Sequence, residues 1–302
     1  MNNKRRLFST LLCVAALTAG LFVSGCGSDK AGGIGSVVSS VVYGGSDEKA
    51  AAKLNTLIDA TNRFNGDNAT WGQNYADSLA KLKGGFQEGA IGRQPHYDTL
   101  KEALEQSKKE GSTFKEVDTE RDNVLNVLNE LVPTFKDLKA YDDSKAYMND
   151  GGAKGKELAA KYVAQVEKFD AAYAKFNDAL NKANTEQTKK QIEKLKKDGK
   201  KGYAAAMEST LRLTTLVENV EKAPKNADKQ AVEKELNEIQ TLLKSINNDR
   251  GEVLVNSYNS VVGSVRQVLT DANENNLNDM IENFNNYIES YNNTTPDQFD
   301  SK

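Results

Sequence analysis

The stretch YVAQVEKFDAAYAKFNDAL, residues 162–180, decides the fold class of this chain. An α-helix has 3.6 residues per turn, so side chains that recur at steps of four and three lie on one face. The stretch keeps that spacing over its whole length and predicts a long helix whose apolar stripe packs against neighbouring helices. The stripe consists of Tyr162, Val166, Phe169, Tyr173, Phe176 and Leu180.

The same period recurs along most of the chain from Asp47 onward. We find no run of alternating apolar and polar residues at strand length, and only four prolines occur in 302 residues. The chain is therefore expected to be all-α, an elongated helical bundle with coiled-coil-like packing. The further stripes start at Leu54, Val124, Val232, Leu254 and Leu277.

Glycine and proline clusters indicate where the helices end. Residues 84–95 predict a loop region, and Asp150-Gly151-Gly152 predicts a turn before a long helix. Pro224 is expected to separate two helices, Arg250-Gly251 to separate the last two, and Asp198-Gly199 to bend a lysine-rich helix. Residues 47–302 are expected to form a single helical-bundle domain.

The start of the chain has the layout of a secretory signal. Three basic residues at positions 4–6 precede an uncharged run over residues 7–23. The order Val23-Ser24-Gly25-Cys26 then resembles a bacterial lipobox, in which the thiol accepts a diacylglyceryl group. We expect a lipoprotein signal peptide over residues 1–25 and a lipid, diacylglycerol with a fatty acyl chain such as palmitate, on Cys26.

An uncleaved membrane helix is the alternative interpretation of this segment. A span needs about 20 apolar residues, and the run over 7–23 is shorter and contains a serine, two threonines and a glycine. Gly27 follows the cysteine, which resembles a signal for release to the outer membrane in a cell with two membranes. In a cell with one membrane the anchor would face outward from the plasma membrane.

The charge balance disfavours a nucleic-acid partner. The chain has 40 basic and 43 acidic residues, and removal of residues 1–25 takes away three basic ones, which leaves 37 against 43 and a formal charge of −6. Residues 26–46 are rich in Gly and Ser and are expected to form a flexible tether. Both cysteines, Cys13 and Cys26, precede the domain, so we expect no disulfide in it.

Motifs of common catalytic and metal sites are missing from the sequence. His96 is the single histidine and has no cysteine partner in the domain, so no metal site is expected. We find no GxSxG elbow, no phosphate-binding loop and no EF-hand spacing of acids. The sequence therefore predicts a protein that is not an enzyme and has no cofactor besides the lipid.

Two regions are candidate functional surfaces. Residues 141–156 contain Tyr, Asp, Gly and Lys in an arrangement more specific than a connection between two helices requires. A structured turn packed on the bundle explains the same residues. Residues 71–98, with Trp71 and His96, are the candidate for a cleft. The residues proposed for the first surface are Tyr141, Tyr147, Asp150, Lys154 and Lys156.

A lysine-rich run extends from Glu186 to Tyr203, with seven lysines and three acidic residues. One interpretation is a basic patch that contacts anionic lipid or an acidic polymer. The other is a solvated helix surface, which we favour because lysine suits exposed helix.

The lipobox, the tether and three segments of the domain resemble the YiiG-like bacterial lipoproteins, which carry a domain of unknown function. The resemblance covers residues 47–293 and implies an all-helical envelope lipoprotein, without site residues to transfer. The segments are KLNTLIDATN at 53–62, YDDSKAYMND at 141–150 leading into Lys154-Gly155-Lys156, and FNNYIESYN at 284–292.

These observations favour a non-enzymatic binding or scaffolding lipoprotein of the cell envelope. Its expected partners are the lipid bilayer, through Cys26, and an envelope protein or polymer, with no nucleic acid. The alternative is a solute- or polymer-binding lipoprotein with a cleft near residues 71–98. An envelope enzyme ranks third, because histidine and cysteine clusters are missing.

Overall fold

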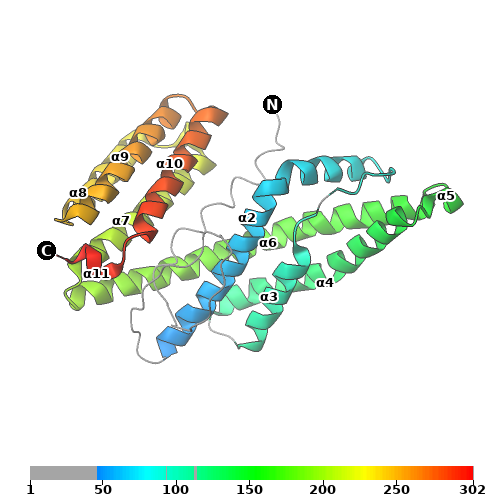
Figure 1. The fold of residues 1–302 in the computed structure, drawn as a ribbon, viewed down its shortest axis with the longest axis horizontal. Helices are drawn as coiled ribbons and strands as arrows, with labels where there is room; N and C mark the ends of the chain where they lie inside the picture. Colours follow the sequence, from blue (N-terminus) through cyan, green and yellow to red (C-terminus); the bar gives the residue numbers. More distant parts are fainter. Residues whose placement is uncertain (1–45, 93, 112–113, 302) are drawn as a thin grey trace. The chain divides into compact units, whose positions relative to one another are not determined.

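The computed structural model describes residues 46–92, 94–111 and 114–301, with the side chains of 46–49 and 66–73 left undescribed. Every regular element in these ranges is helical, which confirms the all-α class (Figure 1). The described residues divide into two compact units, one over residues 52–183 and the other over 184–302 together with residues 46–51. The helix α6, Ala153–Lys197, begins in the first unit and ends in the second. The expected single domain over 47–302 stays a prediction.

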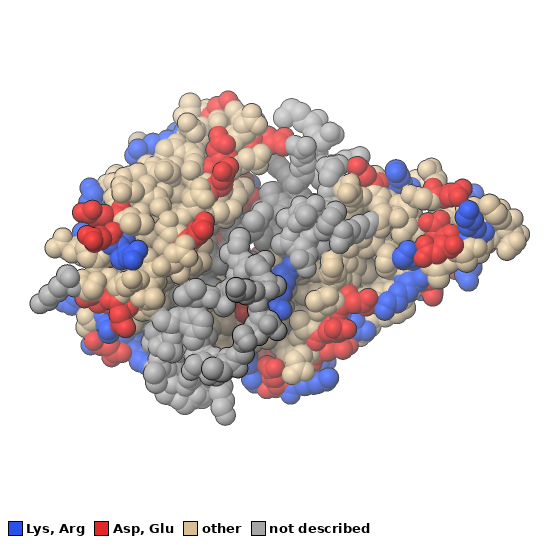
Figure 2. Space-filling model, viewed as in Figure 1, with Lys and Arg blue, Asp and Glu red and all other residues tan. Residues whose placement is uncertain are grey.

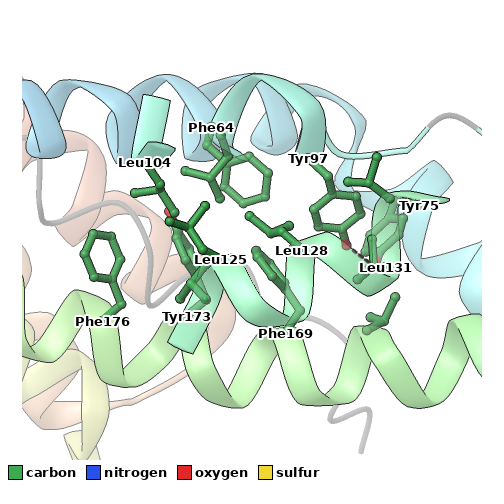
Figure 3. Close-up of a cluster of buried hydrophobic side chains, with 14 of the residues drawn as sticks. Phe64, Tyr75, Tyr97, Leu104, Leu125, Leu128, Leu131, Phe169, Tyr173 and Phe176 are labelled. Atoms are coloured by element: carbon green, nitrogen blue, oxygen red, sulfur yellow. Dashed lines mark hydrogen bonds between the residues drawn. The ribbon is translucent and has the colours of Figure 1, made fainter. Parts of the chain in front are cut away.

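The first unit contains α2 (Ser46–Lys83) from residue 52 onward, α3 (Tyr97–Lys109), α4 (Lys115–Asp143), the short α5 (Tyr147–Asp150) and the first part of α6. All six residues of the stripe at 162–180 are buried, as the sequence predicts. The rings of Phe169 and Tyr173 meet Phe64 of α2, and Phe169 also meets Tyr97 of α3 (Figure 3). Phe169 lies at the centre, with ring centroids 5.0 Å from Tyr97, 5.2 Å from Tyr173 and 5.8 Å from Phe64.

The second unit contains the end of α6, then α7 (Lys201–Lys222), a 3₁₀ turn (Pro224–Asn226), α8 (Lys229–Lys244), α9 (Asp249–Thr270), α10 (Glu274–Asn292) and α11 (Pro296–Phe299). Here α9 packs on α8 and α10, and α7 contacts all three. The apolar stripes of α8, α9 and α10 are buried at Leu236, Tyr258 and Phe284. Two arginines hold α8 to its neighbours, since Arg212 pairs with Glu235 at 2.6 Å and Arg266 with Glu233 at 2.7 Å.

Three helix ends follow the sequence prediction closely. The described residues of the loop after α2 are 84–92 and 94–96. The helix α6 follows the turn at Gly151-Gly152, where both glycines have positive φ. At the Pro224 break, the Asp228 side chain caps α8 by accepting the amides of Gln230 and Ala231. Such caps satisfy amides that have no partner inside the helix.

Two predicted breaks are wrong in position or kind. The chain breaks at Asp198-Gly199, where Gly199 has φ +79°, so it does not merely bend a helix there. Arg250-Gly251 lies in the first turn of α9, because the Asn248 side chain accepts both of their amides and starts the helix earlier. The last two long helices, α9 and α10, are separated at residues 271–273.

A C-terminal strap, residues 296–301, closes one end of the second unit. The Asp300 carboxylate accepts the amide of Gly202 at 2.7 Å, at the start of α7. The Asn248 amide group donates to the strap carbonyls of Gln298, Phe299 and Ser301, at 3.0–3.1 Å. The ring of Phe299 is buried and stacks on Tyr203 and Tyr291. The strap thus ties the first turns of α7 and α9 to the end of α10.

Candidate functional site

The candidate surface at residues 141–156 is a helix junction in the structure. The Tyr141 hydroxyl donates to Asp150 Oδ1 at 2.5 Å, and the same carboxylate accepts the amides of Gly152 at 2.9 Å and Lys154 at 3.1 Å. The Tyr141 hydroxyl and these amides hold the pKa of Asp150 below its usual range. Asp150 therefore caps α6 as an anion, where the helix dipole favours negative charge.

Close aromatic packing fixes the same junction. The Phe86 ring contacts Tyr141 at 5.2 Å and Tyr147 at 5.7 Å between centroids. A Cβ atom at Gly155 would lie 2.6 Å from both Phe86 and Tyr141, so only glycine lets α6 pass this close. The structure thus brings three of the five proposed residues, Tyr141, Tyr147 and Asp150, into one junction. The other two, Lys154 and Lys156, are exposed on α6.

The described part of the candidate cleft, residues 74–98, is tied down by Ser78 of α2. The Ser78 hydroxyl donates to the carbonyl of Ala90 at 2.7 Å and accepts the amide of Gly92 at 2.9 Å. His96 is exposed at the start of α3, where its carbonyl accepts the amide of Leu100. The Trp71 side chain lies outside the described residues.

Three tyrosine hydroxyls meet beneath this loop. Tyr75 and Tyr97 share a hydrogen bond of 2.9 Å between their hydroxyl oxygens (Figure 3), and Tyr162 donates to the side-chain carbonyl of Gln94. Burial raises the pKa of all three tyrosines. Burial thus favours the neutral phenol form of these side chains, and their hydroxyls bond to each other and to Gln94 inside the first unit.

Asp170 of α6 is the one carboxyl near this cluster with an elevated pKa. Burial raises its pKa to about 6, the Glu167 carboxylate adds to the effect, and the Lys83 ammonium group opposes it. Lys83 is itself engaged by Glu167 at 2.9 Å. Nothing in the sequence singles out Asp170 or Ser78, because the burial of Asp170 and the bonds of Ser78 to Ala90 and Gly92 arise only when the chain folds.

Asp170→Asn is expected to stabilise the protein at neutral pH and to have little effect near pH 4. A carboxyl with a raised pKa binds its proton more tightly in the folded state, so its contribution to stability is lost as pH rises from about 4 through about 6. After allowance for partial solvent exposure, the gain at pH 7.5 is about 1–2 kcal/mol. Urea unfolding followed by circular dichroism at both pH values measures it. An equal loss of stability at both would contradict the assignment.

The lysine-rich run at 186–203 spans the end of α6 and the start of α7. Part of its charge is neutralised, because Lys196 pairs with Glu208 at 2.8 Å and Lys200 with Asp297 at 3.0 Å. The exposed side of α6 there forms an open depression of about 470 Å³. It is lined by Lys189, Lys190, Glu193, Lys194, Lys197 and Asp198. On the face drawn in Figure 2, acidic and basic side chains are intermingled.

The expected lipidation site lies elsewhere in the chain. Val23, Ser24, Gly25 and Cys26 lie outside the described residues, as does the expected tether. Among the helices of the described ranges, none combines the length and apolar character needed to cross a bilayer. The same ranges hold no cluster of three or more His, Cys, Asp or Glu side chains arranged to bind a metal ion.

These features define a helical domain in which Asp150 and Asp300 accept amides at helix starts and Ser78 bonds to the loop after α2. Comparison with known families assigns it more closely. Residues 48–293 match the family described as "Protein of unknown function (DUF3829)", and the chain belongs to that family. No curated protein and no solved structure matches the chain.

Proposed function

We propose that this protein is a lipoprotein of the bacterial cell envelope, similar to the YiiG-like lipoproteins, that binds or scaffolds an envelope component without catalysing a reaction. The observation that carries the proposal is the order of the sequence: a basic start, an uncharged run, Val23-Ser24-Gly25-Cys26, a Gly/Ser-rich tether, and then the family domain from residue 48. Each part has the place that a lipid-anchored domain requires.

The chemistry of the anchor follows from the cysteine thiol. Its sulfur attacks the glyceryl carbon of a membrane phospholipid: the bond from that carbon to the phosphate oxygen breaks, a thioether forms, the phosphorylated head group leaves and the thiol proton is released. Water then hydrolyses the peptide bond before Cys26, and the new amino terminus becomes available for an acyl chain. Two or more chains give stable attachment, whereas one chain gives marginal binding. The proposed location is the outer membrane in a cell with two membranes and the outer face of the plasma membrane otherwise.

A binding or scaffolding role agrees with the structural contacts that several polar side chains of the domain make. The Asp150 carboxylate caps α6, and Asp300 caps α7. The Ser78 hydroxyl holds the loop at 84–96, and the hydroxyls of Tyr75 and Tyr97 bond to each other. Each of these groups, which a catalytic site could otherwise use, is engaged by a structural partner.

Cys26→Ala is expected to abolish lipid attachment, and Cys13→Ala, the matched control within the same leader, is expected to leave it intact. Cells fed an alkyne fatty acid should label the parent and the Cys13→Ala chain but not the Cys26→Ala chain. The last should also stay in the larger, uncleaved form, because the peptidase acts on the lipid-modified cysteine. Gel mobility and intact mass measure both effects.

Retention of the label by the Cys26→Ala chain would contradict the proposal. Protease treatment of intact and lysed cells, followed with an antibody to the domain, then locates the anchored protein. Digestion on intact cells places the domain on the outer surface, and protection until lysis places it in the periplasm. An enzymatic function would instead be indicated by a turnover that one substitution in the domain removes.

A further inference from the structure

The outer side of α6 carries lysines at a strict interval of seven residues. In the first unit this lysine row runs over nearly the whole length that α6 contributes, and all its members are exposed. The spacing continues in the second unit at Lys189 and Lys196. The members in the first unit are Lys154, Lys161, Lys168, Lys175 and Lys182.

Helix geometry places neighbouring lysines of the row close to one line, with a drift that sums to about 80° between Lys154 and Lys182. Seven residues advance an α-helix by about 10.5 Å and rotate it by about 20° short of two full turns. The positions in the row lie immediately before the buried residues Tyr162, Phe169 and Phe176. The heptad spacing of those core rings therefore fixes the spacing of the charges, and rigid packing holds the row in place.

Of the five members of the lysine row in the first unit, four have no acidic side chain from the described part of the chain paired with them. Lys182 pairs with Glu116 at 2.8 Å, but within the described residues Lys154, Lys161, Lys168 and Lys175 make no ion pair. Glu157 and Asp178 are exposed acids that lie three residues after members of the row. The positions three residues after Lys161 and Lys168 are Ala164 and Ala171. These small side chains leave the two lysines accessible to a flat surface.

The composition of α6 differs sharply from that of the chain around it. The helix has eleven lysines, six acidic residues and no arginine, in a chain whose formal charge is −3. Lysine is a flexible point charge, which suits phosphates at variable positions, whereas arginine suits fixed bidentate contacts. The composition therefore fits a diffuse anionic surface better than a single shaped ligand.

We infer that the lysine row of α6 is a docking surface for the phosphate groups of an anionic phospholipid bilayer. The inference rests on the proposed function, because a lipid on Cys26 and a tether of about 20 residues, with a root-mean-square span of about 25 Å, would keep the domain near the bilayer at high effective concentration. Each lysine near an anionic leaflet strengthens the contact about fivefold. Docking would lay the first unit along the membrane.

The test uses the full chain reconstituted in vesicles of phosphatidylcholine, with or without phosphatidylglycerol. Limited lysine acetylation, read by peptide mass spectrometry, reports the accessibility of each amine. With anionic lipid, acetylation of Lys154 and Lys175 is expected to slow about fivefold, while the exposed Lys222 and Lys244 keep their rates. Molar salt should remove the difference, because it screens charges beyond about 3 Å.

Substitution inside the row gives the matched comparison. Lys161→Gln with Lys168→Gln should restore rapid acetylation of Lys154 and Lys175 on anionic vesicles. The control, Lys225→Gln with Lys229→Gln, removes the same charge from exposed positions in the second unit and should leave the protection intact. Restoration by both pairs would indicate a general charge effect and would overturn the inference.

Two further outcomes overturn it. Equal acetylation rates on both kinds of vesicle exclude the bilayer, and protection by soluble polyphosphate without protection by anionic vesicles assigns the row to a polymer. The mass of the peptide that begins at Cys26 separates this inference from the proposed function. An acylated Cys26 without protection rejects the docking surface alone, and protection with an unmodified Cys26 rejects the anchor alone.

Discussion

Gly202→Ala is expected to lower the free energy of unfolding of the second unit by about 2–4 kcal/mol. A Cβ atom at this position would lie 2.0 Å from the carbonyl oxygen of Phe299 and 2.8 Å from its carbonyl carbon. Backbone atoms on both sides cannot rotate away as a side chain can, so the C-terminal strap must move. Its movement breaks the bond from the Gly202 amide to Asp300 and exposes the Phe299 ring.

The control is a glycine-to-alanine substitution at another helical position of the second unit. Gly263 lies inside α9, where a Cβ atom would have no neighbour within 4 Å, so Gly263→Ala should stabilise the unit by about 0.5–1 kcal/mol. Denaturant unfolding followed by circular dichroism measures both variants. Hydrogen exchange at the amides of Gly202 and Tyr203 should accelerate only in Gly202→Ala. Unchanged exchange there would show that the strap accommodates the methyl group.

Phe169→Ala is expected to destabilise the first unit by about 3–5 kcal/mol. The Phe169 ring is 3% exposed and touches the rings of Phe64, Tyr97 and Tyr173, which come from three helices. Its removal leaves a cavity between rings that cannot all collapse into it, so packing energy is lost in addition to the hydrophobic transfer energy.

Phe169→Leu provides the comparison for volume, since it keeps most of the apolar bulk while removing the aromatic contacts. A loss of about 1–1.5 kcal/mol is expected for it. Urea denaturation at a fixed pH, with circular dichroism at 222 nm as the signal, resolves the two variants. Equal losses for Phe169→Ala and Phe169→Leu would mean that ring contacts, rather than cavity formation, dominate at this position.

The fold was predictable where one local rule decides the outcome. The stripe from Tyr162 to Leu180 is buried as its spacing requires, and Pro224 separates two helices as its missing amide requires. Gly202 could not be placed in the same way. A Cβ atom there would lie 2.0 Å from the carbonyl oxygen of Phe299, and that approach is created by the tertiary fold and leaves no local sign in the sequence. At Gly251 the carbonyl that a Cβ would meet at 2.0 Å belongs to Ile246, five residues earlier in the chain, so the constraint there is local.

The candidate surface at 141–156 is a helix junction in the structure, and its proposed role in binding a partner stays a prediction. Its unusual order of residues reflects a junction, in which Asp150 caps α6 and Gly155 admits the Phe86 ring. The sequence offered the structured turn as the alternative, and the contacts support that interpretation. Asp170 could not have been found from the sequence, since its raised pKa arises mainly from burial, which only the folded packing creates.

The C-terminal strap also bears on the order in which the second unit folds. Its bonds join residues 98 apart, Gly202 and Asp300, and residues 51 apart, Asn248 and Phe299. The contacts of α8 with α9 and of α9 with α10 close much shorter loops, and short loops form first because they cost less chain entropy. Docking of the strap is then a late step, on the native side of the folding barrier. Loss of the strap contacts should therefore raise the rate of unfolding and leave the rate of folding almost unchanged. The strap would thus set the lifetime of the native state.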